Sequence, residues 1–166
     1  FLVAFIVNVT GTILRDIDKI VGSRREIYTV YPALIDTVGD VGSVVGSTAT
    51  TKLALGLIKP TFSSIKDHMN EIAGSWLASI IMFVAYAVLS LVIGGSTTLG
   101  ELVTFTGQLL LTNVLAVCVM AVIAYSVAIY TFRRGWNPDN FVIPIESSLA
   151  DTLTTAAIII ALALIV

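Results

Sequence analysis

Three aspartates lie in stretches that are otherwise apolar or rich in small residues, and their spacing suits the binding of a metal cation. Asp36 and Asp40 are four residues apart, so they share one face of a helix. Asp151 stands between Ser147 and Thr155, again at intervals of four. Small hard cations such as Mg²⁺ are bound by carboxylate, hydroxyl and carbonyl oxygens, and Mg²⁺ keeps part of its water shell. The pattern favours a site for a hydrated divalent cation.

The composition of the chain is that of an integral membrane protein. Hydrophobic residues make up 57% of the 166 residues and charged residues only 12%, whereas about a quarter of the residues in soluble domains are charged. The mean hydropathy is +0.98. A carboxylate at the centre of a membrane helix costs roughly 2.5–3.5 kcal/mol on insertion scales, so it normally faces a bundle interior, a partner or an aqueous path. The net charge of −2 does not support nucleic-acid binding.

Five apolar stretches predict an all-α, polytopic membrane protein with five transmembrane helices, forming a single domain over 1–166 in contact with the lipid bilayer. The first stretch, 1–14, would reach only about 21 Å as a helix, short of the roughly 30 Å hydrocarbon core. We interpret it as the end of a truncated first span. We expect a multi-pass protein of the cell membrane. The other spans are predicted at about 28–58, 72–93, 102–132 and 141–166.

The second stretch is unusual for a membrane span because it carries two aspartates and many small residues. Gly42 and Gly46 form a small-xxx-small pair, which permits close contact between helices. The alternative is a locally unwound segment that lines a cavity, as in transporters. In the fourth stretch, Gln108, Thr112 and Asn113 are predicted mainly to bond to neighbouring helices, with a role in an ion pathway as the alternative.

Other chemistries find little support in the sequence. His68, the only histidine, can be drawn as a metal site with Asp67 and Glu71, but no further ligands follow at a definite spacing, which favours a solvated loop. The single cysteine, Cys118, excludes an intrachain disulfide and is interpreted as a small buried hydrophobe. Serine or cysteine catalysis lacks a partner base, and Walker, Rossmann and HExxH patterns are absent. We predict no enzymatic activity and no cofactor.

Two rival interpretations of the acids come from other classes. In a structural role, they would pair with Lys52, or with Gln108 and Asn113, instead of binding an ion. If the chain were an intramembrane aspartyl protease, Asp40 and Asp151 would share a proton and activate water. The Gly-x-Gly-Asp sequence expected of such a protease is not present before Asp40, so the protease is a remote alternative.

Two separated segments also resemble signatures of a known family. The segment 32–56 resembles the second-helix signature of the MgtE magnesium transporter family, Pro-Leu-Ile, then Gly-Gly-Asn-x-Gly-x-Gln, then Arg-x-Leu-Ala-x-Gly. The segment 137–151 resembles the fifth-helix signature of that family, with Pro138, Pro144 and Asp151 in register. The sequence of this second segment looks closest to that of the related eukaryotic solute carrier family 41. The resemblance covers essentially the whole chain.

The resemblance implies transport of Mg²⁺, as the transported ion, or of other divalent cations through a pathway at a two-fold interface. The chain is then expected to form a homodimer or to pair with a similar half. Asp151 would be the central ion-recognition group, and Ser147 falls where the family supplies a backbone carbonyl. Asp40 replaces an asparagine of the family signature, and Asp36 and Glu146 stand where the family commonly has uncharged residues. We therefore expect a more anionic site.

The full set of predicted metal-site residues is Asp151, Asp40, Asp36, Ser147, Glu146 and Thr155. The relatives point both to a channel and to an exchanger or efflux protein coupled to Na⁺ or H⁺, and both alternatives stay open at this point.

Overall fold

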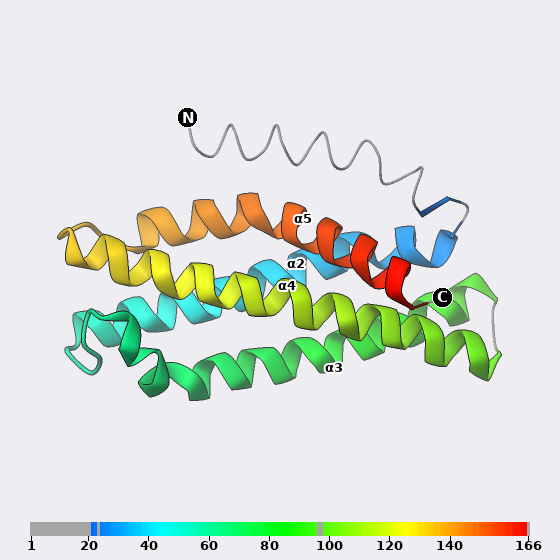
Figure 1. Cartoon of the computed structure of the whole chain (residues 1–166), viewed down its shortest axis with the longest axis horizontal. Helices are drawn as coiled ribbons and strands as arrows, with labels where there is room; N and C mark the ends of the chain where they lie inside the picture. Colours follow the sequence, from blue (N-terminus) through cyan, green and yellow to red (C-terminus); the bar gives the residue numbers. More distant parts are fainter. Residues whose placement is uncertain (1–20, 23, 96–97, 166) are drawn as a thin grey trace.

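The computed structural model describes residues 21–22, 24–95 and 98–165 of the chain. Over these ranges it is all-helical and contains no strand, which confirms the all-α prediction for this part of the chain (Figure 1). The predicted first span, 1–14, lies outside the described residues. The elements are α2 (Arg25–Ala54), η1 (Phe62–His68), α3 (Met69–Gly94), α4 (Leu99–Arg133) and α5 (Asp139–Leu164).

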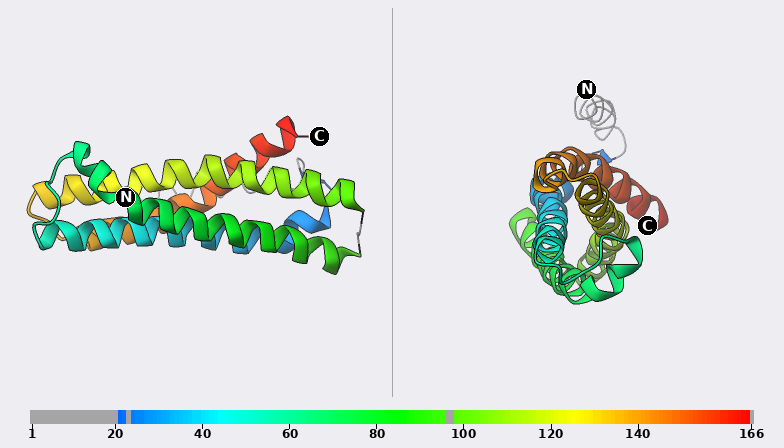
Figure 2. Two further views of the ribbon diagram at one scale, coloured as in Figure 1. Left: turned by 90° about the horizontal axis from the view of Figure 1, so that it is seen from below. Right: turned by 90° about the vertical axis from the view of Figure 1, so that its left-hand side faces the viewer.

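The four long helices form a bundle along one axis (Figures 1 and 2). α2 and α4 each pack against the other three helices, and α3 and α5 flank this central pair. The C-terminal end of α5 leans away from the axis of the others (Figure 2, left). α2 and α4 supply most of the buried core side chains, many of them valine, leucine or alanine, as expected when small residues allow helices to approach closely.

Local sequence signals set the ends of the helices. α3 is followed by Gly95, which has a φ of 76°; this left-handed conformation carries no steric penalty for glycine and closes a helix. Thr98 caps α4, since its hydroxyl accepts a hydrogen bond from the backbone N–H of Glu101 at 3.4 Å. Pro32 and Pro144 lie inside α2 and α5, yet both helices continue through them.

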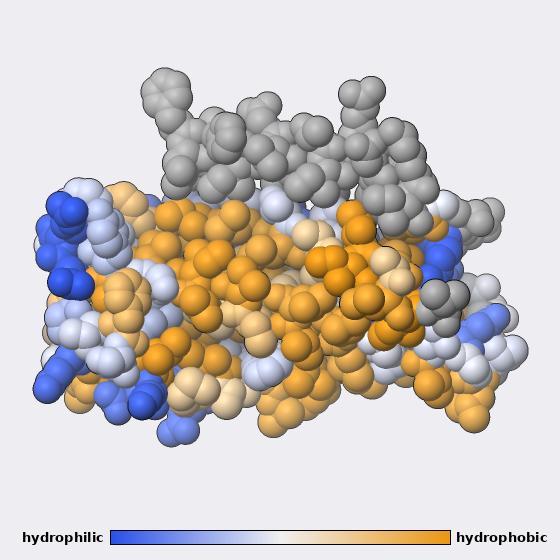
Figure 3. Space-filling model, viewed as in Figure 1, coloured by the Kyte–Doolittle hydropathy of each residue, from blue (hydrophilic) through white to orange (hydrophobic). Residues whose placement is uncertain are grey.

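Three helical segments are long and apolar enough to cross a membrane: Phe62–Gly94, Leu99–Arg133 and Asp139–Leu164. On the face seen in Figure 3, apolar residues cover the middle of the described part of the molecule, and hydrophilic ones gather toward its two ends. Large apolar side chains such as Leu77 and Ile93 are exposed on α3, as expected of a surface that faces lipid. These features point to a membrane protein. α2 is not among the three segments, so five spans stay a prediction.

Polar side chains of α4 form hydrogen bonds to neighbouring segments of the bundle. Asn113 is fully buried; its Oδ1 accepts a hydrogen bond from Trp76 Nε1 at 2.8 Å, and its Nδ2 donates to Ser79 Oγ at 2.9 Å. Gln108 Nε2 donates to the carbonyl of Ile165 at 2.7 Å. The predicted bonds to neighbouring segments are thus confirmed for both amides, whereas Thr112 bonds within its own helix.

The interpretation of Cys118 as a buried residue is wrong, because its side chain is exposed on α4. The helix has many apolar residues on every side, and hydropathy alone does not say which of them point outward.

Asn113→Ala is expected to lower the free energy of unfolding in detergent by about 1–3 kcal/mol, because it removes two hydrogen bonds between α3 and α4. The measurement is reversible denaturant unfolding followed by tryptophan fluorescence. Val114→Ala is the control, since Val114 is the next residue and is exposed. Equal stability of the two variants would show that the amide contributes nothing to the bundle.

Candidate functional site

α2 and α5, the helices that carry the predicted site, are joined by two pairs of polar side chains. The hydroxyl of Tyr31 is hydrogen-bonded to Thr155 Oγ1, and Ser43 Oγ donates to Glu146 Oε1. Advancing along α2 therefore corresponds to moving back along α5, so the two helices are antiparallel. Sequence reasoning identified neither Tyr31 nor Ser43 as a partner of α5, because the register of two helices distant in sequence is fixed only by their packing.

Glycines bring α2 and α5 into close contact between these pairs. A Cβ atom on Gly46 would lie 2.2 Å from Val142 Cγ1, and one on Gly42 would lie 3.1 Å from Glu146 Oε2. The first distance leaves no room for a side chain and the second is a tight contact, so the prediction that this pair of glycines permits close contact between helices is confirmed. The alternative of an unwound segment is wrong, because α2 is helical without a break from Arg25 to Ala54.

The register places Asp36 and Asp151 at about the same height along the bundle. Tyr31 of α2 is hydrogen-bonded to Thr155 of α5. Asp36 comes about one turn after Tyr31 and Asp151 one turn before Thr155, and in antiparallel helices these steps run in the same direction. Asp36 and Asp40 are exposed, and Asp151 is partly buried. In the described part of the chain, no hydrogen bond or ion pair is made by the carboxylate of any of these three aspartates.

The absence of such partners argues against the structural alternative. Lys52 is paired with Glu71, Nζ to Oε1 at 2.7 Å. The amides of Gln108 and Asn113 are engaged elsewhere. Within the described ranges no hydrogen bond joins Asp40 to Asp151, which leaves the protease alternative without support. Three carboxylates on α2 and α5 are therefore without a compensating partner among the described residues.

Asp36 and Asp40 line a hollow of about 300 Å³ between α2 and α3. Hydroxyl groups contribute to its wall, including Thr37 and Tyr86, whose oxygens are 3.2 Å apart. The aspartates thus lie at a polar recess large enough for several water molecules. A cation there can keep most of its hydration shell.

The other predicted residues have different environments. Glu146 is only 2% exposed; one of its oxygens is bonded to Ser43 and the other has no hydrogen-bond partner. Asp40 is near enough to act electrostatically on Glu146. Thr155 is fully buried, where its hydroxyl also donates to the Asp151 carbonyl. Ser147 is exposed on α5. The predicted set is thus divided between an exposed face and the α2–α5 contact.

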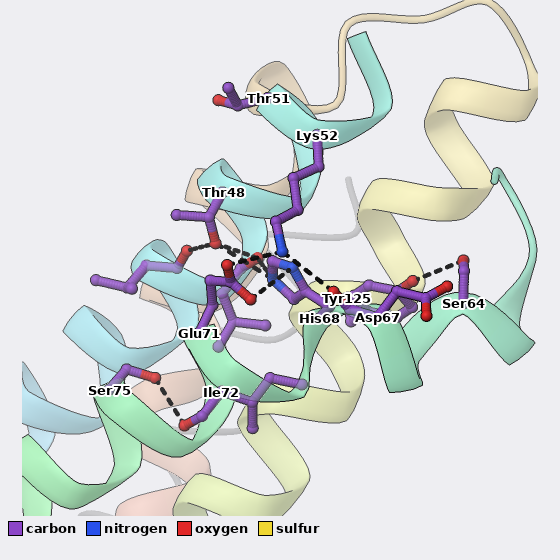
Figure 4. Close-up of polar contacts among 12 residues, drawn as sticks. Thr48, Thr51, Lys52, Ser64, Asp67, His68, Glu71, Ile72, Ser75 and Tyr125 are labelled. Atoms are coloured by element: carbon purple, nitrogen blue, oxygen red, sulfur yellow. Dashed lines mark hydrogen bonds and ion pairs between the residues drawn. The ribbon is translucent and has the colours of Figure 1, made fainter. Parts of the chain in front are cut away.

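The interpretation of His68 as part of a solvated loop is wrong. Its imidazole is fully buried where η1 meets α2, α3 and α4 (Figure 4). The sequence did not predict this burial, because the residues around His68 are polar. In the structure, η1 folds back against the bundle and turns the histidine inward. Among the described residues there is no group of three or more His, Cys, Asp or Glu side chains that could hold a metal ion.

An all-helical bundle with an apolar surface and uncompensated acids on its paired helices has the features of a membrane protein that handles ions. Comparison with known families agrees: the model of the MgtE family, described as divalent cation transporter, matches residues 31–161. The chain belongs to the MgtE divalent cation transporter family, which confirms the resemblance of its two signatures. No curated protein and no solved structure matches the chain significantly.

Proposed function

We propose that this chain transports Mg²⁺ or a related divalent cation across the cell membrane, through a pathway at the two-fold interface of a homodimer or of two similar halves. Each unit would be one domain with five transmembrane helices. The observation that carries the proposal is the set of three aspartates on α2 and α5 that have no partner in the described part of the chain, which belongs to the MgtE family. Unpaired charges within a membrane domain are costly, so they are expected where a cation compensates them.

Asp151 is the proposed ion-recognition group. It is partly buried, and therefore interacts with a cation more strongly than a fully solvated carboxylate. Ser147 is one helical turn away and supplies further oxygens. Thr155 and Glu146 hold α5 against α2 through Tyr31 and Ser43, so their role is to position Asp151.

The number of carboxylates supports the proposed two-fold symmetry. One chain supplies a single Asp151, and a two-fold axis beside α5 would bring a second one to the same ion, as an isologous interface requires. The exposed acids of α2 support such an interface, because a surface that carries Asp36 and Asp40 is poorly suited to lipid.

Mg²⁺ flux into liposomes loaded with a magnesium-sensitive dye tests the proposal. Flux above that of protein-free liposomes is expected. Opposing gradients of Na⁺ and H⁺ separate the two transport modes, because an exchanger is accelerated by the gradient of its counter-ion and a channel is not. If Mg²⁺, Mn²⁺, Co²⁺ and Ca²⁺ all fail to enter or leave under every gradient, the proposed function is wrong.

Asp36→Asn and Asp40→Asn are each expected to raise the Mg²⁺ concentration for half-maximal flux by about three- to tenfold, with little change in maximal flux. Removing one charge near a hydrated ion costs on the order of 1 kcal/mol. Asp67→Asn, an exposed acid of η1, is the control. Unchanged concentration dependence in both α2 variants would remove these residues from the pathway.

A further inference from the structure

The buried imidazole of His68 has its two nitrogens in different polar environments. Nε2 lies 3.0 Å from the carbonyl oxygen of Val45 and 3.2 Å from Thr48 Oγ1, both on α2. Nδ1 lies 3.6 Å from Glu71 Oε2 on α3. The ring also packs against Tyr125 of α4, with centroids 5.4 Å apart. His68 therefore joins three helices at one corner of the bundle (Figure 4).

Neither neutral form of the ring satisfies both sides. With the proton on Nε2, the ring donates to the Val45 carbonyl, but the lone pair of Nδ1 then faces the carboxylate of Glu71. With the proton on Nδ1, the lone pair of Nε2 faces the carbonyl of Val45. The Thr48 hydroxyl can donate either to the carbonyl of Val44 or to Nε2. Even in the second case, the lone pair of Nε2 still faces the carbonyl of Val45. Only the imidazolium presents a donor on both sides.

No other described group supplies the missing donor. Nδ1 of His68 and Oε2 of Glu71 are both buried without a hydrogen-bond partner in the described part of the chain. Lys52 bonds to the other carboxylate oxygen of Glu71, at 2.7 Å, and to the carbonyl of Asp67, at 3.1 Å. The hydroxyl of Tyr125 is bonded to Ser64 at 2.9 Å and not to the ring.

The charges that face His68 are thus one carboxylate, Glu71 on α3, and one ammonium, Lys52 on α2. Their side chains are 28% and 22% exposed, so Glu71 and Lys52 connect the fully buried ring to the surface of the bundle. Glu71 favours a proton on the ring, whereas Lys52 and burial oppose it. The neutral ring is then expected near neutral pH and the imidazolium on acidification.

We propose that His68 is a proton-binding site that ties α2 to η1 and α3 when it is protonated, and so makes divalent-cation transport dependent on pH. The bound proton is carried by Nδ1 of His68, which faces Oε2 of Glu71 at an ion-pair distance of 3.6 Å, and the Nε2–H donates to the backbone of α2 at Val45. Val45 directly precedes Gly46 and is two residues from Ser43. Gly46 and Ser43 both contact α5. A change at His68 therefore acts on the helix pair that carries the candidate cation site.

The titration of His68 is directly measurable because it is the only histidine in the chain. In protein labelled with ¹³C,¹⁵N-histidine and reconstituted in nanodiscs, the ring resonances are expected to be those of the neutral ring near pH 7 and to change to those of the imidazolium on acidification toward about pH 5. Glu71→Gln should move the midpoint to lower pH and Lys52→Gln to higher pH, each by about a five- to tenfold change in proton affinity. Lys66→Gln, an exposed lysine of η1, should leave it nearly unchanged. A ring that stays neutral down to about pH 5, or midpoints equal in all variants, would overturn the proton site.

The effect on transport rests on the proposed function and is tested separately. His68→Gln keeps a polar side chain but cannot bind the proton, so Mg²⁺ flux in this variant is expected to lose a several-fold dependence on pH that the unmodified protein shows over the range of the titration. An identical pH profile in both proteins would refute the link between His68 and transport. Absence of flux in the unmodified protein would instead refute the transport proposal, while the titration still decides the proton site.

Discussion

Asp151→Asn is expected to reduce Mg²⁺ flux into liposomes by at least about a hundredfold, in protein that remains folded. Asparagine has nearly the same shape as aspartate but lacks the charge, so it offers an Mg²⁺ ion one neutral oxygen in place of a carboxylate. In the proposed two-fold assembly, two such changes would face each other across the axis, which would double the loss of binding free energy for a shared ion. Asp151 makes no side-chain hydrogen bond in the described structure, so the fold is expected to tolerate the change.

Asp139→Asn is a suitable control because it removes an acid from the first turn of the same helix. Flux in this variant should stay within about twofold of the unmodified protein. Asp151→Ala should behave like Asp151→Asn, and near-normal flux in both Asp151 variants would show that Asp151 is a structural acid. Thermal unfolding of each variant separates loss of the ion site from loss of the fold.

Gly46→Ala is expected to lower the free energy of unfolding by about 1–3 kcal/mol or more, the usual cost of overpacking a closely packed contact. The added Cβ would lie 2.2 Å from Val142 Cγ1. Val142 cannot turn aside easily, because a β-branched side chain has one strongly preferred rotamer in a helix. α2 and α5 must therefore move apart, and flux should fall together with stability.

A second substitution tests whether this clash is the cause. Val142→Ala removes the crowding methyl groups, so the double variant Gly46→Ala/Val142→Ala should be more stable than Gly46→Ala alone. Gly39→Ala is the matched control on α2, since its Cβ would lie 3.7 Å from Ala150, an ordinary contact. Equal destabilisation at Gly39 and Gly46 would point to the helix backbone, not to the packing of α5.

Much of the fold was predictable because it depends on local patterns. Long apolar stretches predicted helices, and the small residues Gly42 and Gly46 predicted the close approach that the structure has. The predicted second span extended to residue 58, but α2 ends at Ala54, near Gly56, which has a φ of 70°. Hydropathy did not reveal this end, since the residues beyond it are also apolar.

The candidate site was only partly predictable, because its geometry depends on contacts between distant segments. The residue types identified Asp36, Asp40 and Asp151 as unusual, but not that they lack partners. That Glu146 meets Ser43 follows from the register of α5 on α2, which no local pattern encodes. The burial of His68 was missed for the same reason: its partners come from three other helices.

The unequal polarity of the helices also bears on how the protein enters the membrane during synthesis. The segments that contain α3, α4 and α5 are apolar enough to partition into lipid singly, and α2 is not among them. If α2 is a membrane span, as the five-span proposal requires, Asp36 and Asp40 would each cost up to roughly 2.5–3.5 kcal/mol at the bilayer centre, and α2 would depend on neighbours that are translated after it. It is therefore expected to stay at the insertion machinery until α4 and α5 emerge, so that membrane integration and tertiary folding of this chain are a single event.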